Sequence, residues 1–560
     1  MRRASPFLML ALGLAACQGE DAYLGSTRVN YQCGSRCQLE QGAPANAGDW
    51  FFNPEATLGE APSIVYPLSG SVHPQDLGEL TLQFRRGRSD FTVFRVRIAS
   101  AEGNLAYDFF TPCLALQGDG CRYLLKGPTW DDARADLVGK PAVLTVTGST
   151  AVDGVMKSSD PLPLSVSTSS LQNKGFYYWT SVPLYSGVPG DQDTGIFRLP
   201  FGADRAEPFI MPNSEANDRE CGACHSVSRD GSTIAFTARN DDGADDQRSG
   251  VLITARTAQP EEHFIEPAVD ATYDSSMMAL SSDGRRVLVA YDDRLVLRSG
   301  TNDDPAFQAG AEIASLSAAE LGGKIAYFPE FSKDDDAIVL TLSDQPDSAI
   351  AVQSGDIAIV DVDLSDDSFG DVKIVVPGTA SEFHFYPTWS PDAQYIAFAS
   401  APRGPGDDGF AAKSYDQKNA RLRLVHRDGG QVYELANATH ELEKWSTFPK
   451  FAPFTAQEQG GLMFLTFNSK INYGLLLDND VLAPRDKRAQ LWMSAIDIDK
   501  LPEDPSGAPI WLPFQDAGQS SHLGIWTSDV KCRTDVGALP ACDIGQRCDE
   551  LTQTCKVIVK

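Results

Sequence analysis

Apolar and polar residues alternate with a period of two along short runs between residues 59 and 170. In residues 94–98 the apolar side chains fall on one face, and Arg95 and Arg97 fall on the other. Residues 143–147 and 164–167 repeat the pattern. A period of two is typical of β-strands that bury one face. The pattern predicts a β-sandwich for residues 59–170.

A longer repeat of about 50 residues begins near residue 171. Its clearest copy is residues 386–393 (YPTWSPDA), which precede an apolar strand at 395–398. Three further copies share this plan of a first strand, a polar turn and a second strand: 277–284, 328–334 and 448–453. The segment 220–236 is the first of the series, with His225 at the position that Met278, Pro329, Pro387 and Pro449 hold in the others. A third apolar strand follows each copy, so the repeats predict blades of a β-propeller.

Five sets of strands are complete, and a sixth is divided between the ends of the repeat region. Residues 522–528 resemble a first strand without successors, whereas 176–179 and 195–199 resemble later strands without a first. Joining these segments builds one blade from both ends and leaves no open sheet edge. We therefore expect an all-β chain whose propeller has six blades.

The expected organisation has five parts. They are a lipoprotein signal peptide at 1–17, a flexible tether at 18–58, the sandwich at 59–170, the propeller at 171–530 and a cysteine-rich tail at 531–560.

These repeats resemble the TolB-type β-propellers of bacterial envelopes, and the sandwich resembles an immunoglobulin or fibronectin type III domain. The first resemblance covers about 350 residues and rests on the Trp-Ser-Pro-Asp repeats, clearest at Trp389–Asp392. It implies an envelope protein that docks other envelope proteins. The departure from TolB is a Cys-x-x-Cys-His motif in the first blade. In this the chain is similar to predicted envelope propellers that carry haem motifs, for which no activity is implied.

The N-terminus has the features of a targeting segment. Arg2 and Arg3 precede a short apolar run that ends in Leu14-Ala15-Ala16-Cys17, which looks like a bacterial lipobox. Cys17 is then the lipid attachment site, and Gln18 after it favours the outer membrane. The alternative is an ordinary secretory signal cut near Ala16. The net charge of −29 argues against nucleic acid and anionic headgroups as partners, and favours a basic redox partner.

The motif Cys221-Gly222-Ala223-Cys224-His225 is the attachment signal for c-type haem. Each thiol can add to one vinyl group of the haem, and the adjacent imidazole can ligate its iron. The motif predicts one covalent haem c held by Cys221, Cys224 and His225. The alternative is a local disulfide or redox dithiol beside an ordinary loop histidine.

Eight of the 11 cysteines remain after Cys17, Cys221 and Cys224 are assigned, an even number suited to an oxidising compartment. Cys113 and Cys121 bracket a short loop, and Cys33 lies near Cys37. The tail contains four cysteines, for which disulfides are favoured over zinc. The acidic run 240–246 fits solvated turns better than a calcium loop.

Strong ligands for the second face of the iron are His or Met. His522 is the favoured candidate, because ring closure puts its blade next to the haem. Met277, Met278 and His384 are the alternatives; it also remains open that both methionines are core packing and that His522 is a surface histidine. His73, in a Pro-flanked turn of the sandwich, is expected to be a surface residue.

Three functions follow from these features. The first is a lipid-anchored electron carrier of the envelope, with one haem at the mouth of the propeller channel. The second is a haem enzyme with an open iron site. The third is a binding module for envelope proteins. A fully ligated iron favours the first, a vacant iron site the second, and absence of haem the third.

Overall fold

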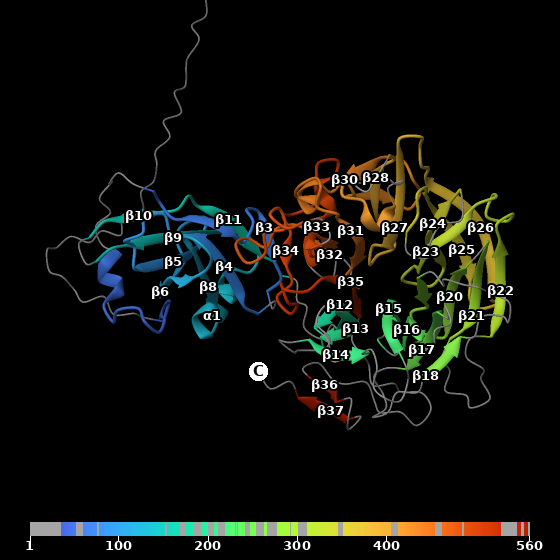
Figure 1. The fold of residues 1–560 in the computed structure, drawn as a ribbon, viewed down its shortest axis with the longest axis horizontal. Coiled ribbons are helices and arrows are strands. Elements are labelled where there is room, and N and C mark those ends of the chain that lie inside the picture. The colour runs from blue at the N-terminus through green and yellow to red at the C-terminus, as the bar shows by residue number, and fades with distance from the viewer. Residues whose placement is uncertain are drawn as a thin grey trace, which may run out of the picture.

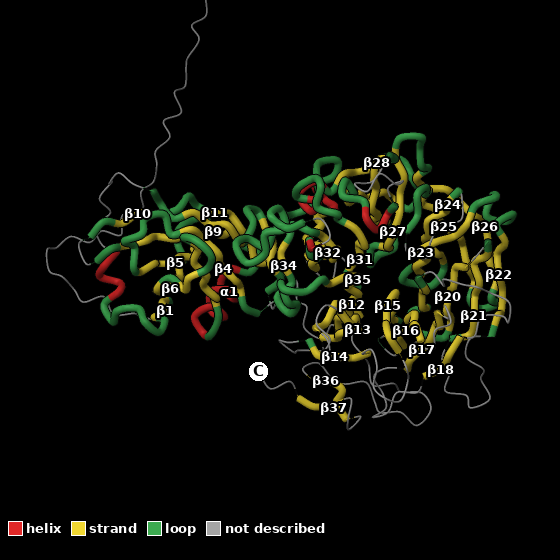
Figure 2. The backbone as a smooth tube through the Cα atoms, viewed as in Figure 1, coloured by secondary structure: helices red, strands yellow, loops and turns green. Residues whose placement is uncertain are grey.

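The computed structural model describes about seven tenths of the chain, and it consists of two β-rich regions (Figures 1 and 2). The described residues are 35–51, 60–75, 78–151, 154–168, 175–183, 192–199, 206–210, 219–229, 231, 233–240, 247–253, 262–265, 277–291, 293–300, 311–344, 351–404, 413–453, 462–483, 486–527, 546–549 and 554–557. Strands dominate both regions, and α1 (Pro128–Leu137) and α2 (Ala436–Thr439) are the α-helices among these residues.

The N-terminal region contains two sheets, drawn in blue and cyan in Figure 1. The larger has the order β1-β6-β5-β9-β11-β3, with β10 on β9, and the smaller has the order β2-β4-β8-β7. Phe94, Val96 and Ile98 on β5 are fully buried between the sheets, whereas Arg97 points away and pairs with Asp108 at 2.7 Å. The alternation in the sequence therefore predicted the buried face of this strand. The strands are β1 (Cys37–Leu39), β2 (Ser63–Tyr66), β3 (Ser71–His73), β4 (Leu80–Arg85), β5 (Val93–Ser100), β6 (Ala106–Pro112), β7 (Leu114–Ala115), β8 (Gly120–Leu125), β9 (Pro141–Ser149), β10 (Met156–Ser158) and β11 (Leu162–Val166).

Part of the segment expected to be a flexible tether belongs to this region instead. β1 pairs in parallel with β6, with Cys37 opposite Asp108. The 3-10 helix Ala47–Phe51 follows, and Phe51 is buried with its ring 5.6 Å from that of Phe110. The mostly polar composition of residues 18–58 gave no indication of these buried apolar residues. The tether prediction is therefore wrong for residues 37–51.

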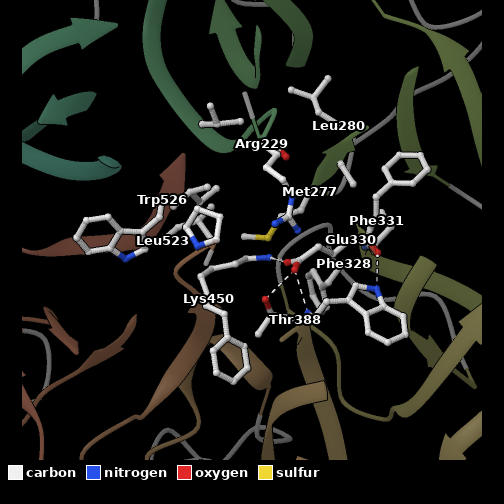
Figure 3. Close-up of a pocket in the computed structure, with 18 of the residues that line it drawn as sticks. Arg229, Met277, Leu280, Phe328, Glu330, Phe331, Thr388, Lys450, Leu523 and Trp526 are labelled. Carbon is white, nitrogen blue, oxygen red and sulfur yellow. Dashed lines mark hydrogen bonds and ion pairs between the residues drawn. The ribbon is translucent and has the colours of Figure 1, made fainter. Parts of the chain in front are cut away.

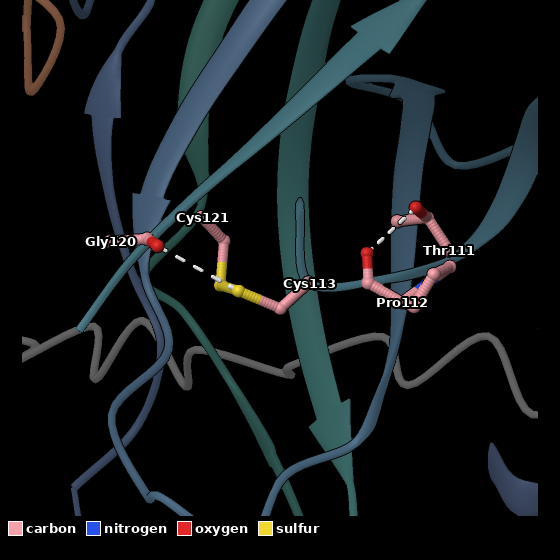
Figure 4. The surroundings of a disulfide bond; sticks show 5 residues. All are labelled: Thr111, Pro112, Cys113, Gly120 and Cys121. Atoms are coloured by element: carbon pink, nitrogen blue, oxygen red, sulfur yellow. Dashed lines mark hydrogen bonds between the residues drawn. A yellow bond between two sulfur atoms is a disulfide. The ribbon is translucent and has the colours of Figure 1, made fainter. Parts of the chain in front are cut away.

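Two cysteines of this region form a disulfide. Figure 4 shows the bond between Cys113 and Cys121, which closes the turn from β6 to β8 beside Gly120. Cys37 is also disulfide-bonded, and its partner lies outside the described residues. The Cys113–Cys121 bond joins the two cysteines that the sequence places around a short loop.

His73 is buried, contrary to the expectation of a surface residue. Only 6% of it is exposed, and its Nε2 lies 2.9 Å from Ser71 Oγ. His73 is the last residue of β3, where it pairs with Val166 of β11. Burial lowers the pKa of His73 to about 4.

This burial predicts a loss of stability in acid. The folded-state pKa of His73 is below the usual value of about 6.5, so its contribution is complete above pH 6.5 and is lost as the pH falls through 4. We expect His73→Gln to reduce the fall in the free energy of unfolding between pH 7 and pH 4 by up to about 3 kcal/mol. Urea unfolding at a series of pH values measures this, with His426→Gln, at a partly exposed histidine, as control. Equal pH profiles for the His73 variant and the wild type would contradict the prediction.

The second region consists of six sets of strands arranged as blades around a centre, coloured green through red in Figure 1. In each complete blade four strands pair in chain order, from innermost to outermost. The region is a β-propeller. The complete blades are β15 (Arg219–Val227), β16 (Thr233–Asn240), β17 (Gln247–Ile253) and β18 (Glu262–Ile265); β19 (Met278–Leu280), β20 (Arg286–Tyr291), β21 (Arg294–Ser299) and β22 (Glu312–Ser317); β23 (Ile325–Phe331), β24 (Ala337–Ser343), β25 (Asp356–Asp363) and β26 (Ser368–Val376); β27 (Glu382–Trp389), β28 (Tyr395–Pro402), β29 (Arg421–His426) and β30 (Val432–Glu434); β31 (Thr447–Phe451), β32 (Leu462–Ser469), β33 (Gln490–Asp497) and β34 (Ile510–Trp511).

The polar turn of the repeat explains how its first two strands are joined. Ser390 Oγ donates to Asp392 Oδ1 at 2.5 Å and accepts the backbone N–H of Tyr395 at 2.9 Å. Ser281 makes the matching bonds to Asp283 and Arg286 in another blade. Because the serine hydroxyl satisfies the turn's backbone, the Ser and Asp of the repeat fix the hairpin.

The divided sixth blade closes the ring, as the sequence predicted. β35 (Ser521–Thr527) pairs antiparallel with β12 (Gly175–Pro183), which pairs with β13 (Gln192–Leu199), and β14 (Glu207–Ile210) completes the blade. One bridge, between Thr194 and Cys221, joins this blade to the first. Strands from both ends of the repeat region therefore share one sheet.

The sandwich region packs against the fifth blade. Tyr66 on β2 accepts the backbone N–H of Trp511 at 2.9 Å, and its ring lies 4.9 Å from that of Tyr473. Gln83 on β4 accepts the backbone N–H groups of Leu475 and Leu476, at 2.6 and 3.1 Å. A bridge between Ser71 and Ala508 adds backbone pairing, so the two regions are held together by a partly buried interface.

The two ends of the chain contain little that the structure describes. Cys17, the rest of the signal segment and residues 18–34 lie outside the described residues, as do Cys532, Cys542 and most of the acidic run 240–246. A small hairpin, β36 (Gln546–Asp549) and β37 (Thr554–Val557), puts Cys548 opposite Cys555 in the tail. No helix among the described residues is long and apolar enough to cross a membrane.

Candidate functional site

The innermost strands of the propeller share a two-residue bulge. On β23 the pairing skips Phe328 and Pro329, on β27 Tyr386 and Pro387, and on β31 Phe448 and Pro449. The first bulged residue has a φ of 54°, 52° and 50° in these three strands. A left-handed non-glycine residue costs about 1–2 kcal/mol, so a bulge that recurs is built into the fold. Proline suits the second position, because that residue has no ladder bond to donate.

The Cys-x-x-Cys-His motif occupies the same bulge in the first blade. The pairing of β15 with β16 skips Cys224 and His225, and Cys224 has a φ of 49°. Cys224 thus matches Phe328, and His225 matches Pro329. The second cysteine and the histidine of the motif therefore occupy this bulge, and His225 lines the channel cavity.

Residues at the position of Phe328 in five blades gather at the centre of the propeller; four of them are first bulged residues, and Met277 is matched by sequence, since pairing in its blade begins at Met278. They form a collar, which we define as Met277, Phe328, Tyr386, Phe448 and Leu523. The ring of Tyr386 lies 4.4 Å from that of Phe328 and stacks on that of Phe448 at 3.8 Å. Cys224 holds the equivalent position in the remaining blade.

His225 is buried and faces the channel cavity behind the collar. It is 2% exposed, and within the described part of the chain no hydrogen bond of ordinary geometry reaches Nδ1 or Nε2. Burial, together with the charge of Lys450, lowers the pKa of His225 to about 4, although the Tyr177 backbone acts in the opposite direction. The imidazole is therefore neutral at pH 7, which is the form that ligates metals.

The channel cavity has a volume of about 110 Å³ and a mixed lining. Figure 3 shows Met277, Arg229, Lys450 and Glu330 directed toward its middle. Glu330 forms an ion pair with Lys450 and accepts the Thr388 hydroxyl at 2.7 Å. Burial lowers the pKa of Arg229, and the charge of Glu330 opposes this effect. The cavity thus combines a neutral imidazole, a thioether and a compensated set of charges.

The donor set fits a covalent haem, and the volume limits where such a group could lie. A buried neutral histidine without hydrogen bonds of ordinary geometry is suited to an iron, since most buried imidazoles have a polar partner. The side chain of Cys221 lies outside what the structure describes, and that of Cys224 is half-buried. At about 110 Å³ the cavity is smaller than the 300–1,000 Å³ of typical ligand pockets, so a haem held by Cys224 and His225 would extend beyond it.

The structure separates the four candidates for the second iron ligand. Met277 and Met278 line the channel cavity together with His225. His522 lines a different cavity, where its Nδ1 lies 2.9 Å from Asn468 Nδ2. His384 lines neither of these two cavities, and its Nδ1 lies 2.8 Å from Ser400 Oγ. Among these candidates only the methionines share a space with His225.

Sequence reasoning missed the charged residues of the channel. Glu330 and Lys450 follow the bulge directly in their blades, at the position that Thr388 and Ser226 hold in two others. The signal was present in the repeats, because this position is charged in two blades and polar in two more. Tracing the repeats one residue beyond the proline would have found it.

No protein-family model matches the chain, and no curated protein matches it. Among solved structures it is similar to a prolyl endopeptidase, at 15% identity and a TM-score of 0.34, over 61% of this chain and 40% of that one. It is similar to Kuenenia stuttgartiensis hydrazine synthase at 14% identity and a TM-score of 0.27, over 49% and 62% of the two chains. A puromycin hydrolase gives 12% identity and 0.33, over 67% and 52%. The chain thus spans less than two thirds of each of these structures, and each likeness concerns the fold alone.

Proposed function

We propose that this protein is a c-type haem protein of the bacterial envelope that transfers electrons through one covalently bound haem. The observation that carries the proposal is His225, which is buried and neutral in the lining of the channel cavity, directly after Cys224. The spacing of Cys221, Cys224 and His225 supplies the chemistry of attachment.

Each residue of the site has a distinct part in this proposal. Cys221 and Cys224 would hold the haem through thioether bonds, and His225 would ligate its iron. The haem supplies one-electron chemistry when bound. Lys450 lies within electrostatic reach of His225, because its charge lowers that pKa. Glu330, the ion-pair partner of Lys450, offsets part of this charge.

Met277 is the second iron ligand that the cavity supports best. It shares the channel cavity with His225, and Figure 3 shows its sulfur in the middle of that space. We expect Met277→Leu to remove the long-wavelength absorption of a thioether–iron bond and to lower the reduction potential, since a Met ligand raises it. Absorption spectra and potentiometry of the haem-loaded protein measure both effects. Met493→Leu, a buried methionine of the fifth blade, is the control.

Other results would assign the second iron ligand differently. A spectrum unchanged by Met277→Leu but altered by His522→Ala would assign the second ligand to His522. A high-spin spectrum unaffected by either substitution would indicate an open iron site and favour the haem enzyme. The mixed polar lining of the channel cavity, with Arg229 and Glu330, is the feature that favours that second function.

We also propose that the protein is attached to the outer membrane through lipid on Cys17, from which it would reach a basic redox partner. The lipobox-like sequence 14–17 and the net charge of −29 support this arrangement. We expect Cys17→Ala to move the protein from the membrane fraction to the soluble fraction. Mass spectrometry of the N-terminus provides the check, and an unmodified Cys17 in membrane-bound protein would contradict the proposal.

A further inference from the structure

The turns between the first and second strands share one backbone geometry in the first four complete blades. In each turn the backbone N–H of the fourth residue donates to the carbonyl of the serine that begins the turn, as from Gly284 to Ser281 at 3.0 Å. The fourth residue has a φ between 56° and 71°, a region that favours glycine. The four residues at this position are Gly231, Gly284, Asp335 and Ala393. Asp335 is therefore a titratable residue at a position suited to glycine.

The fourth residue of a turn lies close to the turn of the preceding blade. A Cβ atom on Gly284 would lie 2.4 Å from Thr233 Oγ1 and 3.5 Å from Ser228 Cβ, both in the first blade. A side chain at that position of the second blade would therefore meet the first blade. In the third blade the position does carry a side chain, that of Asp335, and it meets Ser282 of the second blade. The contact between these two blades thus includes a titratable group.

The carboxylate of Asp335 accepts hydrogen bonds from Ser282. The Ser282 backbone N–H points between its two oxygens, each 3.0 Å from the nitrogen, and the Ser282 hydroxyl donates to Oδ1 at 3.1 Å. The hydroxyl oxygen also lies 3.1 Å from the carbonyl oxygen of Lys333. A left-handed non-glycine residue persists only where its surroundings enforce it, and such residues gather at switch regions. We call the contacts between Asp335 and Ser282 the turn latch.

The surroundings of Asp335 move its titration toward neutral pH. Burial raises the pKa of Asp335 to about 6. The hydrogen bonds from Ser282 and the charge of Arg229 act in the opposite direction, whereas the charge of Asp283 adds to the effect of burial. Arg229 belongs to the first-blade turn, and Asp283 belongs to the second-blade turn. The carboxyl group therefore changes its charge near pH 6, where an aspartate with the ordinary pKa of 3.8 is already charged.

The turn latch lies in the wall of the channel cavity. Ser282 of the second blade and Ser332 of the third both line the cavity, as does Arg229 of the first. The side chain of Asp335 joins the two turns that carry these serines. Separation of the turns would therefore open the cavity wall between the second and third blades.

The raised pKa determines the direction of the pH effect. While the latch is closed, the partly buried site disfavours the charged carboxylate. When the turns separate, water solvates the carboxylate and its pKa returns to about 3.8. Opening is therefore least favourable below pH 3.8, becomes easier as the pH rises toward 6, and changes little above that. In acid the neutral carboxyl group still accepts the Ser282 N–H through its carbonyl oxygen.

We propose that Asp335 and Ser282 form a pH-sensitive latch, which keeps the wall of the channel cavity closed in acid and releases it more readily at neutral pH. The latch controls access to the cavity from the side of the second and third blades. Glycine at the position of Asp335 would keep the turn geometry without any response to pH, as in the first two blades.

The experiment is amide hydrogen exchange of the full-length protein at pH 5 and pH 8, followed by mass spectrometry. After correction for the intrinsic exchange rate at each pH, the opening constant of residues 281–286 and 332–337 is expected to be about tenfold larger at pH 8. Asp335→Asn is expected to remove this difference, because the amide keeps the shape without the charge. Asp335→Gly, which introduces the residue of the first two blades, is expected to remove it as well. Asp334→Asn, at an exposed neighbour in the same turn, is the control and is expected to retain the difference.

The turn at residues 390–395 is the internal reference, because neutral Ala393 holds the corresponding position, and it is expected to open equally at both pH values. Equal opening of the two latch turns at pH 5 and pH 8 in the wild type would overturn the proposal. A pH difference that persists in both Asp335 variants would also overturn it, because another group would then titrate. Thermal melts establish that each variant is folded. Since the measurement follows backbone amides and needs no haem, the latch is tested separately from the proposed electron-transfer function.

Discussion

A chain that ends at Gly518, before β35, is expected to lose the cooperative unfolding of its propeller. β35 is the innermost strand of the sixth blade, and its removal exposes the edge of β12 and one side of the fifth blade. Trp526 is buried, with its ring 4.5 Å from that of Phe176 and its Nε1–H donated to Thr466 at 2.7 Å. Loss of one buried Trp side chain alone costs about 3–5 kcal/mol.

The matched control is a chain that ends at Val530, which keeps β35 and lacks only the cysteine-rich tail. Urea unfolding and size-exclusion chromatography compare the two. We expect the shorter chain to unfold at a much lower urea concentration and to associate through its open edges. If both truncated chains unfold at the same urea concentration as the full chain, β35 does not close the ring.

Cys221→Ala plus Cys224→Ala is expected to abolish covalent haem. The full-length protein would be expressed together with the cytochrome c maturation machinery and separated on a denaturing gel stained for haem. Only thioether-bound haem survives denaturation, so the stain tests attachment directly. Cys224 lies in a bulge that β23, β27 and β31 also contain, where other residue types take its place. Its replacement by alanine should therefore leave the propeller folded.

The control removes the same number of cysteines from the other region. Cys113→Ala plus Cys121→Ala opens a disulfide in the sandwich, far along the chain from the motif, and should keep full haem staining. Staining that persists without Cys221 and Cys224 would place any haem elsewhere. Absence of staining in the wild type would favour the binding module among the three functions.

The repeat pattern was sufficient to predict the blades and the closure of the ring, because strand periodicity and turn chemistry are local properties. Ser390 and Asp392 fix their hairpin by bonds within a few residues. The pattern could not reveal which side chains meet across the channel. The pair of Glu330 and Lys450 joins residues 120 positions apart, and their meeting depends on the arrangement of three blades.

The position of His522 shows the same limit. Its place at the start of an inner strand was predicted, and the strand pairs as expected. The direction of its ring depends on Asn468, a residue of the neighbouring blade that has no sequence signature. Likewise, the few apolar residues around Phe51 do not form a recognisable pattern in a polar segment, although Phe51 is buried against Phe110.

The interface of Tyr66 and Gln83 with the fifth blade has a consequence for how the molecule comes apart. The chain leaves the sandwich at β11 and enters the sixth blade at β12, whereas the sandwich itself is hydrogen-bonded to the fifth blade. The sandwich thus spans the junction where the two ends of the ring meet. Separating the fifth and sixth blades requires the sandwich to detach as well, which raises the barrier to unfolding from this junction. The N-terminal region therefore slows the opening of the ring.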